Sequence, residues 1–264
     1  MPVANTAKVR MDRSILSRPG PSPDQILRYG DGPDHVVDAW LPASTGDRPL
    51  VVAIHGGFWR AGYDRTHTRL MCAALRNAGW PVAAIEYRRV MGRPDATLDD
   101  IRDALARVPG QLPGAGIVVL GHSAGGHLAL WLASTCPPTD LVGTLALSPV
   151  ADLMAAHSAG LSNGAVAEFL GGPPGCRPDL DPALLGQPAG AVTLIHGADD
   201  TTVPPALSHS YVRSHPRVRL VELPGTAHFE LIDPASHAWP TVQSELESLG
   251  AAPAGPSKPR NSVP

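Results

Sequence analysis

The sequence predicts one α/β domain built on a mostly parallel sheet. Short apolar runs of strand length alternate along the chain with segments whose apolar residues recur at helical spacing. Several of these runs are continuously apolar, as strands covered by helices on both faces are. The chain has 264 residues and 43% of them are apolar, which is enough to form one large core.

The expected elements follow one another in a regular rhythm. Strands are expected at residues 35–44, 50–57, 81–88, 117–123, 141–150, 191–200 and 217–225. Helices are expected around residues 67–80, 97–108, 124–135 and 237–249. Gly79 stands where the first helix would end, and Thr97 is the expected N-cap of the second. Strands and helices that alternate in this way predict a parallel sheet with helices on both faces.

Three segments fall outside that rhythm. Residues 151–190 are rich in Gly and Pro and contain one short helical pattern, so we interpret them as a cap over the carboxyl edge of the sheet. An ordinary surface loop is the alternative. Residues 1–27 are expected to form an N-terminal extension, 28–250 the domain itself, and 251–264 a disordered tail.

The stretch GHSAGG, residues 121–126, carries the clearest chemical signal. Ser123 follows an apolar strand directly and precedes a helix directly, with Gly121 and Gly125 two residues to either side. A very tight strand-to-helix turn exposes such a serine and requires small neighbours, which is the nucleophile elbow. The N-terminus of the following helix directs its amides and its positive dipole end at the serine, so the amide of Ala124 could bind an oxyanion.

A serine nucleophile needs a base, and proteins with this elbow supply an acid and then a histidine farther along the chain. HGADDTTVP, residues 196–204, ends a predicted strand and offers Asp199 and Asp200. Asp200 is preferred because its offset from the following Val-Pro turn is the usual one. PGTAHFELIDP, residues 224–234, follows the last predicted strand and offers His228. Ser123, Asp200 and His228 would then meet at the carboxyl edge of the sheet.

The other histidines are given structural roles. His209 and His215 fall in or at the end of a helix and are interpreted as solvated surface residues, and His237 falls in the expected last helix. His122 should point away from the site, and His127 lies one helical turn after the serine. Both are expected to pack or to form hydrogen bonds.

The loop HGGFWR, residues 55–60, ends the first buried parallel strand. Glycines at such a position let backbone amides face a substrate, so the amides of Gly57 and Phe58 are expected to complete an oxyanion hole with Ala124. His55 is expected to hold the loop by hydrogen bonding. Trp59 could line an acyl pocket, although packing in the core is an equal alternative.

Together these motifs make the chain similar to the α/β-hydrolase superfamily, over roughly residues 28–249. HGGFW and GHSAGGHLA resemble the loops of the esterase branch that includes hormone-sensitive-lipase-like carboxylesterases, feruloyl-esterase-like domains and kynurenine formamidases. EYRRV, residues 86–90, departs from the DYRLAP pattern of the lipase-like members. The resemblance implies an α/β-hydrolase fold with Ser123 as nucleophile, Asp200 as acid, His228 as base and the HGGFW loop as oxyanion hole.

Two classes of function are open. The first is a serine hydrolase that cleaves a carboxylic ester or an activated amide of a small molecule through an acyl-enzyme, with N-formylkynurenine hydrolysis as a specific alternative. The second is a non-catalytic binding protein on the same fold, because a fold does not entail an activity.

The composition bounds the partners. The formal net charge is -3 and basic residues are not clustered, which argues against nucleic acid as a partner. No apolar run approaches the roughly 20 residues of a membrane span, and the first residues lack a signal-peptide pattern. Cys72, Cys136 and Cys176 are expected to be reduced thiols of a cytoplasmic protein. No metal or organic cofactor is expected, and the oligomeric state is left open.

Overall fold

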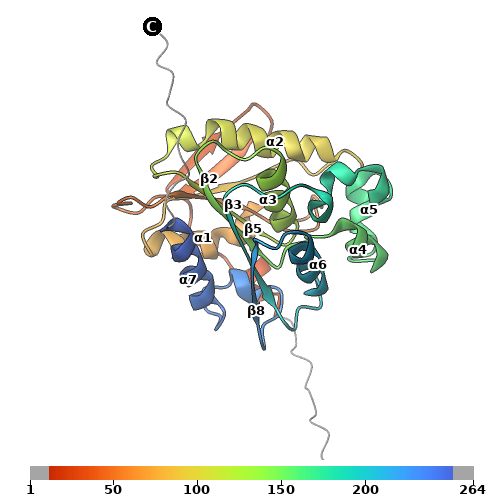
Figure 1. The fold of residues 1–264 in the computed structure, drawn as a ribbon. Coiled ribbons are helices and arrows are strands. Elements are labelled where there is room, and N and C mark those ends of the chain that lie inside the picture. Colours follow the sequence, from red (N-terminus) through yellow and green to blue (C-terminus); the bar gives the residue numbers. More distant parts are fainter. Residues whose placement is uncertain (1–11, 252–264) are drawn as a thin grey trace, which may run out of the picture.

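The computed structural model describes residues 12–251, and its central feature is an eight-stranded sheet (Figure 1). The strands are β1 (Gln25–Arg28), β2 (Val36–Trp40), β3 (Leu50–Ile54), β4 (Val82–Ile85), β5 (Ile117–His122), β6 (Leu141–Leu147), β7 (Ala191–Gly197) and β8 (Arg219–Leu223). The α-helices are α1 (Arg69–Asn77), α2 (Pro94–Arg107), α3 (Ala124–Thr135), α4 (Leu153–Ser158), α5 (Ala165–Leu170), α6 (Ala206–Ser214) and α7 (Trp239–Gly250).

The spatial order of the strands is β1-β2-β4-β3-β5-β6-β7-β8. β2 runs antiparallel to β1 and to β4, whereas all pairs from β4-β3 to β7-β8 are parallel. The prediction of a mostly parallel sheet with flanking helices is confirmed, and the architecture is the α/β-hydrolase fold. Because parallel strands end at one edge, the loops after β3, β5, β7 and β8 come together there.

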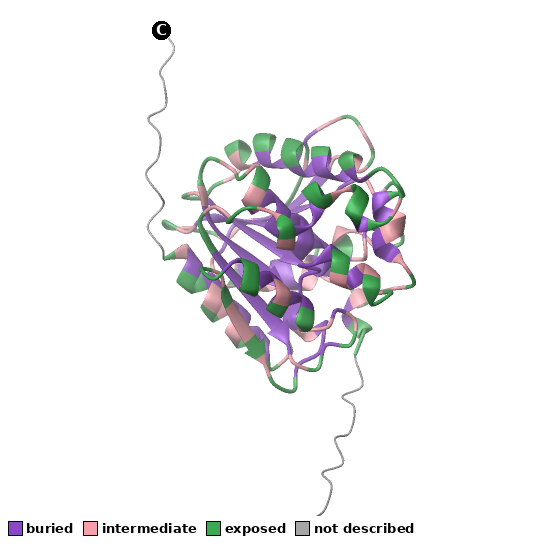
Figure 2. Cartoon of the chain, turned by 45° about the vertical axis from the view of Figure 1, so that its right-hand side comes forward, coloured by how far each residue is buried: buried purple, intermediate pink, exposed green. Residues whose placement is uncertain are grey.

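Helices cover both faces of the sheet, as the alternation of side chains along each strand requires. In β3, Leu50, Val52 and Ile54 pack into the cluster formed with α2 and α3. Val51 and Ala53 point to the other face and pack with α1 and α7. The core in Figure 2 is accordingly a buried sheet between helices whose outer surfaces are exposed.

Helix α3 differs from the others because it is buried on all sides over residues 124–133. It packs on β5 and β6, and its side chains reach both the α2 cluster and a smaller cluster with Tyr211 of α6. A helix that is apolar all round is expected in such an interior position. The serine at its N-terminus is therefore carried on one of the most enclosed elements of the fold.

Two elements differ from the sequence-based expectation. Helix α2 begins with Pro94 after Arg93, so Thr97 is not its N-cap. The buried Thr97 hydroxyl instead donates to the carbonyl of Arg88 at 2.6 Å. Proline at the first helical position, with its fixed φ, marks this start better than the later threonine does.

The N-terminal region also contributes more than an extension. Residues 25–28 form the edge strand β1, which pairs with β2 and was not expected as a strand. A short 3-10 turn, η1 (Ser14–Leu16), precedes it and buries Ile15. The predicted tail at 251–264 lies outside the described residues except for residue 251.

Residues 151–190 form a compact layer beside α3 that contains α4, α5 and three 3-10 turns, η4 (Pro174–Cys176), η5 (Pro178–Leu180) and η6 (Pro182–Leu184). Asp152 caps α4 by accepting from the Ala155 amide at 2.7 Å, and its other oxygen accepts from Ser210 of α6 at 2.6 Å. Val166, Phe169 and Leu180 are buried in the main core. This segment is called the cap below.

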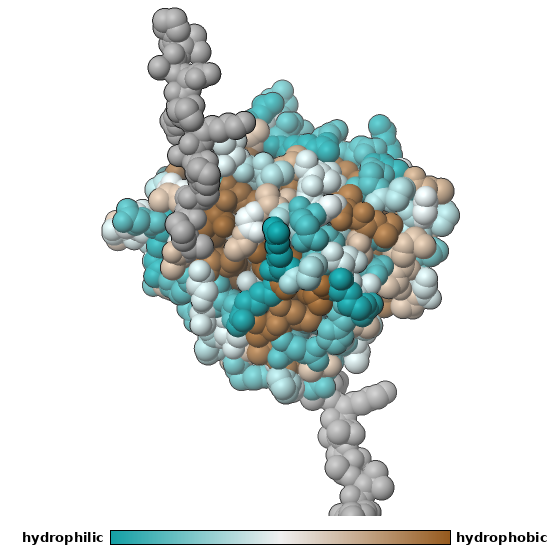
Figure 3. Space-filling view, viewed as in Figure 1, coloured by the Kyte–Doolittle hydropathy of each residue, from teal (hydrophilic) through white to brown (hydrophobic). Residues whose placement is uncertain are grey.

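The surface seen in Figure 3 carries apolar patches separated by hydrophilic side chains. Its large exposed apolar residues among the described part of the chain are Ile26, Val90, Met91, Met154 and Leu184. Within residues 12–251, no helix is both long enough and apolar enough to cross a membrane. Cys72, Cys136 and Cys176 are free thiols.

Candidate active site

Ser123 occupies a sharp turn between β5 and α3. Its backbone angles are φ 58° and ψ -117°, a region that residues other than glycine rarely adopt. Its amide donates to the carbonyl of Leu147 at 2.9 Å, and its carbonyl accepts from the amides of His127 at 3.1 Å and Val150 at 3.2 Å. Hydrogen bonds on both sides of the residue therefore hold the strained conformation in place.

The glycines around Ser123 are explained by close backbone contacts. A Cβ on Gly121 would lie 2.2 Å from the carbonyl oxygen of Gly125, and one on Gly125 would lie 2.1 Å from that of Ile54. A Cβ on Gly126 would meet the Cβ of Pro149 at 2.8 Å. None of these three glycines has a positive φ. Larger residues are therefore excluded because a side chain would have no room, and not because the backbone conformation requires glycine.

The loop after β3 is strained over three consecutive residues. Gly57, Phe58 and Trp59 have φ values of 116°, 50° and 56°. Such a run orients successive amides in a way that regular structure does not. A Cβ on Gly56 would lie 3.0 Å from the Cβ of Ser123, so the loop passes directly against the serine. Among the described residues, the amides of Gly57 and Phe58 donate to no backbone carbonyl.

His55 anchors this loop from below. Its ring nitrogens form hydrogen bonds with the carbonyl of Gly56 at 2.7 Å and with the carboxylate of Glu86 at 2.9 Å. The ring stacks on Tyr87 with centroids 4.3 Å apart, and the Tyr87 hydroxyl donates to the His55 carbonyl at 2.8 Å. Burial would raise the pKa of Glu86, but the contact with His55 and the nearby Arg89 guanidinium hold that pKa well below its usual range.

Asp200 and His228 form a buried pair. Nδ1 of His228 donates to Oδ2 of Asp200 at 2.6 Å, and Oδ1 accepts from the amides of Thr202 at 2.8 Å and Val203 at 2.9 Å. Burial would raise the pKa of Asp200, but the charge of His228 and the hydrogen bonds around the carboxylate hold the pKa well below its usual range. The carboxylate is therefore ionised and fixes the orientation of the imidazole.

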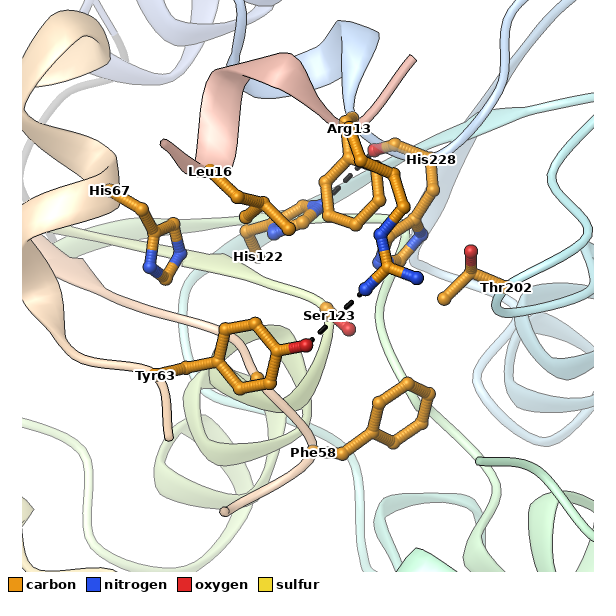
Figure 4. A pocket seen from close by; sticks show the side chains of 11 residues that line it. Arg13, Leu16, Phe58, Tyr63, His67, His122, Ser123, Thr202 and His228 are labelled. Carbon is orange, nitrogen blue, oxygen red and sulfur yellow. Dashed lines mark hydrogen bonds between the residues drawn. The ribbon is translucent and has the colours of Figure 1, made fainter. Parts of the chain in front are cut away.

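Ser123 and His228 line one pocket at the carboxyl edge of the sheet (Figure 4). Gly57 and Phe58 of the strained loop line the same pocket. Because Nδ1 of His228 is hydrogen-bonded to Asp200, Nε2 is the ring nitrogen that can accept a proton from a hydroxyl. Four separate segments thus come together here: the serine elbow, the loop with Asp200, the loop with His228 and the strained loop after β3. Ala124, the first residue of α3, follows the serine directly.

The competing candidates lie elsewhere. Asp199 is exposed, and His209 contacts Glu222 at the surface, with 2.6 Å between Nε2 and Oε2. His237 is exposed just before α7 and contacts the Thr226 hydroxyl at 3.0 Å. His215 is fully buried, which corrects its interpretation as a solvated residue. Its Nε2 contacts the carbonyl of Leu185, so it fastens the end of α6 to the cap.

His122 differs from its expected orientation. It lines the pocket beside His228, with ring centroids 4.6 Å apart, and its Nε2 donates to the His228 carbonyl at 3.1 Å. Burial, together with the charge of His228, holds the pKa of His122 well below its usual value. A neutral His122 therefore supports the loop that carries His228.

Trp59 and His127 pack together beneath the cap. Trp59 is 3% exposed, stacks on Phe169 at 4.6 Å, and is not among the residues that line the pocket of Ser123. His127 meets its ring edge-on at 5.1 Å and donates from Nε2 to the carbonyl of Leu180 at 2.8 Å. Burial lowers the pKa of His127 to about 4. Both side chains join α3 and the HGG loop to the cap.

Sequence reasoning missed several residues of the site. His196 lies 3.5 Å from the Asp200 carboxylate and contacts Ser208 and the Val203 carbonyl, so it is a second partner of the acid loop. Its position four residues before Asp200 in HGADD was the available signal. Arg13 and Tyr63 line the pocket from outside the four motifs, and nothing in their local patterns indicated this.

Comparison with known proteins supports the same branch. The BD-FAE family model matches residues 37–149. Kynurenine formamidase from Salmo salar is 33% identical over 110 residues, which cover 40% of this chain and 37% of that protein. A probable carboxylic ester hydrolase, LipM, of Mycobacterium tuberculosis is 33% identical over 44% of this chain and 29% of its own length. The matched stretches thus span 37% and 29% of the lengths of these two relatives.

Solved structures share the fold over most of the chain. A truncated carbohydrate esterase from gut microbiota has a TM-score of 0.71 at 17% identity, covering 87% of this chain and 99% of that one. Esterase B from Lactobacillus rhamnosis has a TM-score of 0.68 at 21% identity, covering 89% and 87%. At these identities the likeness concerns the fold alone.

Proposed function

We propose that this chain, an α/β-hydrolase similar to the HGG-loop esterases, is a serine hydrolase that cleaves a carboxylic ester or activated amide of a small molecule. The observation that carries the proposal is the Asp200–His228 pair, 2.6 Å between its bonded atoms, in the same pocket as the strained Ser123. An oriented imidazole beside an elbow serine is the arrangement that nucleophilic acyl transfer requires.

In the acylation step, the Ser123 hydroxyl oxygen attacks the substrate carbonyl and His228 takes the hydroxyl proton at Nε2. Asp200 orients the ring and stabilises the imidazolium that forms. The amides of Gly57, Phe58 and Ala124 donate to the oxyanion. The tetrahedral intermediate then collapses, and His228 gives its proton to the leaving oxygen or nitrogen. The products are the acyl-enzyme and the released alcohol or amine.

Deacylation repeats the same proton path with water. His228 removes a proton from a water molecule, whose oxygen attacks the acyl carbonyl, and the collapse returns the proton to Ser123. The carboxylic acid product leaves, and the enzyme is restored. No step calls for a group beyond these side chains and amides. Within residues 12–251, no cluster of three or more His, Cys, Asp or Glu side chains is arranged to hold a metal ion.

The test is hydrolysis of 4-nitrophenyl acetate and butyrate by the wild type, Ser123→Ala and a matched control, Ser148→Ala. Ser148 is also a buried serine with a positive φ, 42°, and it follows the neighbouring strand β6. Ser123→Ala should lose on the order of 10⁴-fold or more in kcat/KM. Ser148→Ala should stay near the wild type. Equal rates for Ser123→Ala and the wild type would overturn the proposal.

A second candidate is hydrolysis of a formyl arylamide such as N-formylkynurenine. The similarity to the salmon and zebrafish kynurenine formamidases, at 33% and 32% identity, favours it. The same machinery would release formate and an arylamine. A kcat/KM for formate release from N-formylkynurenine that exceeds kcat/KM for the 4-nitrophenyl esters would support this candidate. No formate release by an enzyme that hydrolyses the esters well would eliminate it. A wild type inert toward both classes would support a non-catalytic binding protein.

A further inference from the structure

The N-terminal segment of residues 12–20 forms one side of the pocket and is firmly attached to the domain. Ile15 is 2% exposed and belongs to the core cluster shared with α1 and α7. Arg18 forms an ion pair with Asp233 in the loop that follows His228. Asp12 accepts from the Ser14 amide at 2.8 Å and from its hydroxyl at 3.0 Å. The segment therefore holds its exposed side chains in defined positions.

Arg13 extends from this segment over the pocket, as Figure 4 shows. Its Nη2 donates to the hydroxyl of Tyr63 at 3.3 Å, and its guanidinium lies over the ring of Phe229 with 5.7 Å to the centroid. Among the residues that the structure describes, Arg13 has no carboxylate partner. By contrast, its neighbour Arg18 is paired. The charge of Arg13 is thus available at the mouth of the site.

The charge of the pocket lining is one-sided. None of the described lining residues is an aspartate or glutamate. Burial lowers the pKa of His67 to about 4, with the nearby charge of His55 acting in the same direction, and the pKa of His122 is also held low. Both rings are therefore neutral near pH 7. Arg13 is the permanent charge of this lining, so the pocket favours a substrate that carries a negative charge.

We propose that Arg13, with the Tyr63 hydroxyl, forms a subsite for a carboxylate on the substrate, remote from the bond that is cleaved. The substrate class would be a small ester or amide with an apolar or aromatic body and one carboxylate. A guanidinium can donate two hydrogen bonds to one carboxylate, and Tyr63 can donate a third. Phe58 and Phe229 supply apolar surface in the same pocket. The proposal rests on the proposed hydrolase function and specifies its substrate.

Two pairs of substrates test the subsite and locate the carboxylate. 4-Acetoxybenzoate and its methyl ester differ in charge on the leaving group. Mono-4-nitrophenyl succinate and 4-nitrophenyl butyrate differ in charge on the acyl group. In one of the two pairs, Arg13→Met should lower kcat/KM for the charged substrate by about tenfold, chiefly through KM, as expected for loss of a charge-assisted contact. The neutral member should change by less than about twofold.

Two variants control the test. Arg13→Lys keeps the charge but loses the planar fork, so it should recover part of the effect. Arg213→Met removes an equal charge from the exposed side of α6, away from the pocket. It should leave the ratio of kcat/KM for the charged substrate to kcat/KM for the neutral one unchanged in both pairs. The melting temperature of each variant shows whether the segment stays folded. A charged-to-neutral ratio in Arg13→Met that equals the wild-type ratio in both pairs would overturn the proposal.

Binding of benzoate separates this inference from the proposed function. Calorimetric titration of the wild type and Arg13→Met requires no turnover, and the variant should bind benzoate about tenfold more weakly. If neither an ester nor a formyl arylamide is hydrolysed, the hydrolase proposal fails, and benzoate affinity still decides the carboxylate subsite. Equal affinities in the wild type and Arg13→Met, or no binding by either, would contradict it.

Discussion

The pocket has a floor and a rim that are built by different means. The floor comprises the HGG loop, the serine elbow and the loops that carry Asp200 and His228. Its parts lie backbone against backbone. The elbow at Gly125 passes so close to Ile54 that an added Cβ would lie 2.1 Å from the Ile54 carbonyl oxygen. The rim comprises residues 12–20, of which Arg13 and Leu16 line the pocket, and the cap behind them, of which no residue is in the lining. Side chains attach both segments to the floor. The Arg60–Glu168 pair, with 2.7 Å between the charged atoms, is an example.

This difference separates chemistry from selection. Backbone contacts in a packed interior allow little adjustment, so the floor should tolerate few substitutions and should determine the rate for every substrate. Side-chain contacts at a surface are weaker and exchangeable, so residues 12–20, the part of the rim that lines the pocket, should determine which substrates are accepted. The predictions below follow from this contrast, in order of decreasing effect.

The largest expected effect separates two adjacent histidines of the floor. His228→Gln removes the proposed base and should lower kcat/KM by about 10³- to 10⁴-fold, with the melting temperature changed little. His122→Gln keeps a donor toward the His228 carbonyl and should cost far less. Steady-state kinetics of both variants on one ester decide the point. Similar losses in the two variants would show that the floor does not assign the base to His228.

The strained HGG loop should be the next most sensitive part of the floor. A Cβ on Gly57 would lie 2.4 Å from the Cβ of Tyr63, and its φ of 116° is unfavourable for alanine. Gly57→Ala should therefore displace the oxyanion amides and lower kcat by about 10²-fold for charged and neutral esters alike. Gly62→Ala is the control, since a Cβ there meets nothing within 4 Å. A Gly57→Ala variant with normal kcat would place the oxyanion hole elsewhere.

Acid should weaken the attachment of the rim. His127, with a pKa lowered to about 4 by burial, joins α3 to the cap through the Leu180 carbonyl. Below its ordinary pKa of about 6.5 the unfolded chain gains a proton there that the folded chain does not, so stability falls as the pH drops from about 6.5 toward 4. Between pH 7 and 5, this one histidine should cost up to about 2 kcal/mol of unfolding free energy.

Urea unfolding at pH 7 and pH 5 measures that loss. His127→Gln retains an amide donor for the carbonyl but cannot be protonated, so its unfolding free energy should fall less than that of the wild type over the same interval. His209→Gln, which changes an exposed histidine on α6, serves as the control and should behave like the wild type. A wild-type pH dependence retained in full by His127→Gln would contradict the assignment.

The smallest effect is expected where one side chain joins the two regions. Arg60 follows the HGG loop and donates to Glu168 at 2.9 Å and to the carbonyl of Ser162 at 2.7 Å in the cap. Arg60→Met should lower kcat/KM by about three- to tenfold, because exposed ion pairs contribute little energy. Arg177→Met removes a cap arginine that pairs with Asp95 and Asp179, and it should leave activity unchanged. Equal losses would show that general loosening of the cap is responsible.

The sequence was informative about the floor because local patterns determine it. The range 124–135 predicted for the helix after Ser123 agrees with α3, and the glycines that allow the elbow are adjacent to the serine in sequence. Strand ends are recognisable from apolar runs, and parallel strands bring their loops to one edge. The choice between Asp199 and Asp200 rested on a turn offset, and the structure places Asp200 against His228.

The rim was not predictable because long-range contacts determine it. Arg13 lies fifty residues from Tyr63 in sequence, and no periodic pattern connects them. His215 looked like a surface residue at a helix end, yet the cap buries it. The short edge strand β1 has exposed and half-buried residues only, so it lacks the apolar alternation that reveals a strand.

The most direct test of the catalytic account is covalent labelling with a fluorophosphonate followed by mass spectrometry of the digested protein. The phosphorus should be attacked by one serine oxygen with loss of fluoride, giving a single adduct on the peptide that contains Ser123. Labelling should disappear in Ser123→Ala and slow strongly in His228→Gln. An adduct on another residue, or undiminished labelling of Ser123→Ala, would contradict the assignment of Ser123 as the nucleophile.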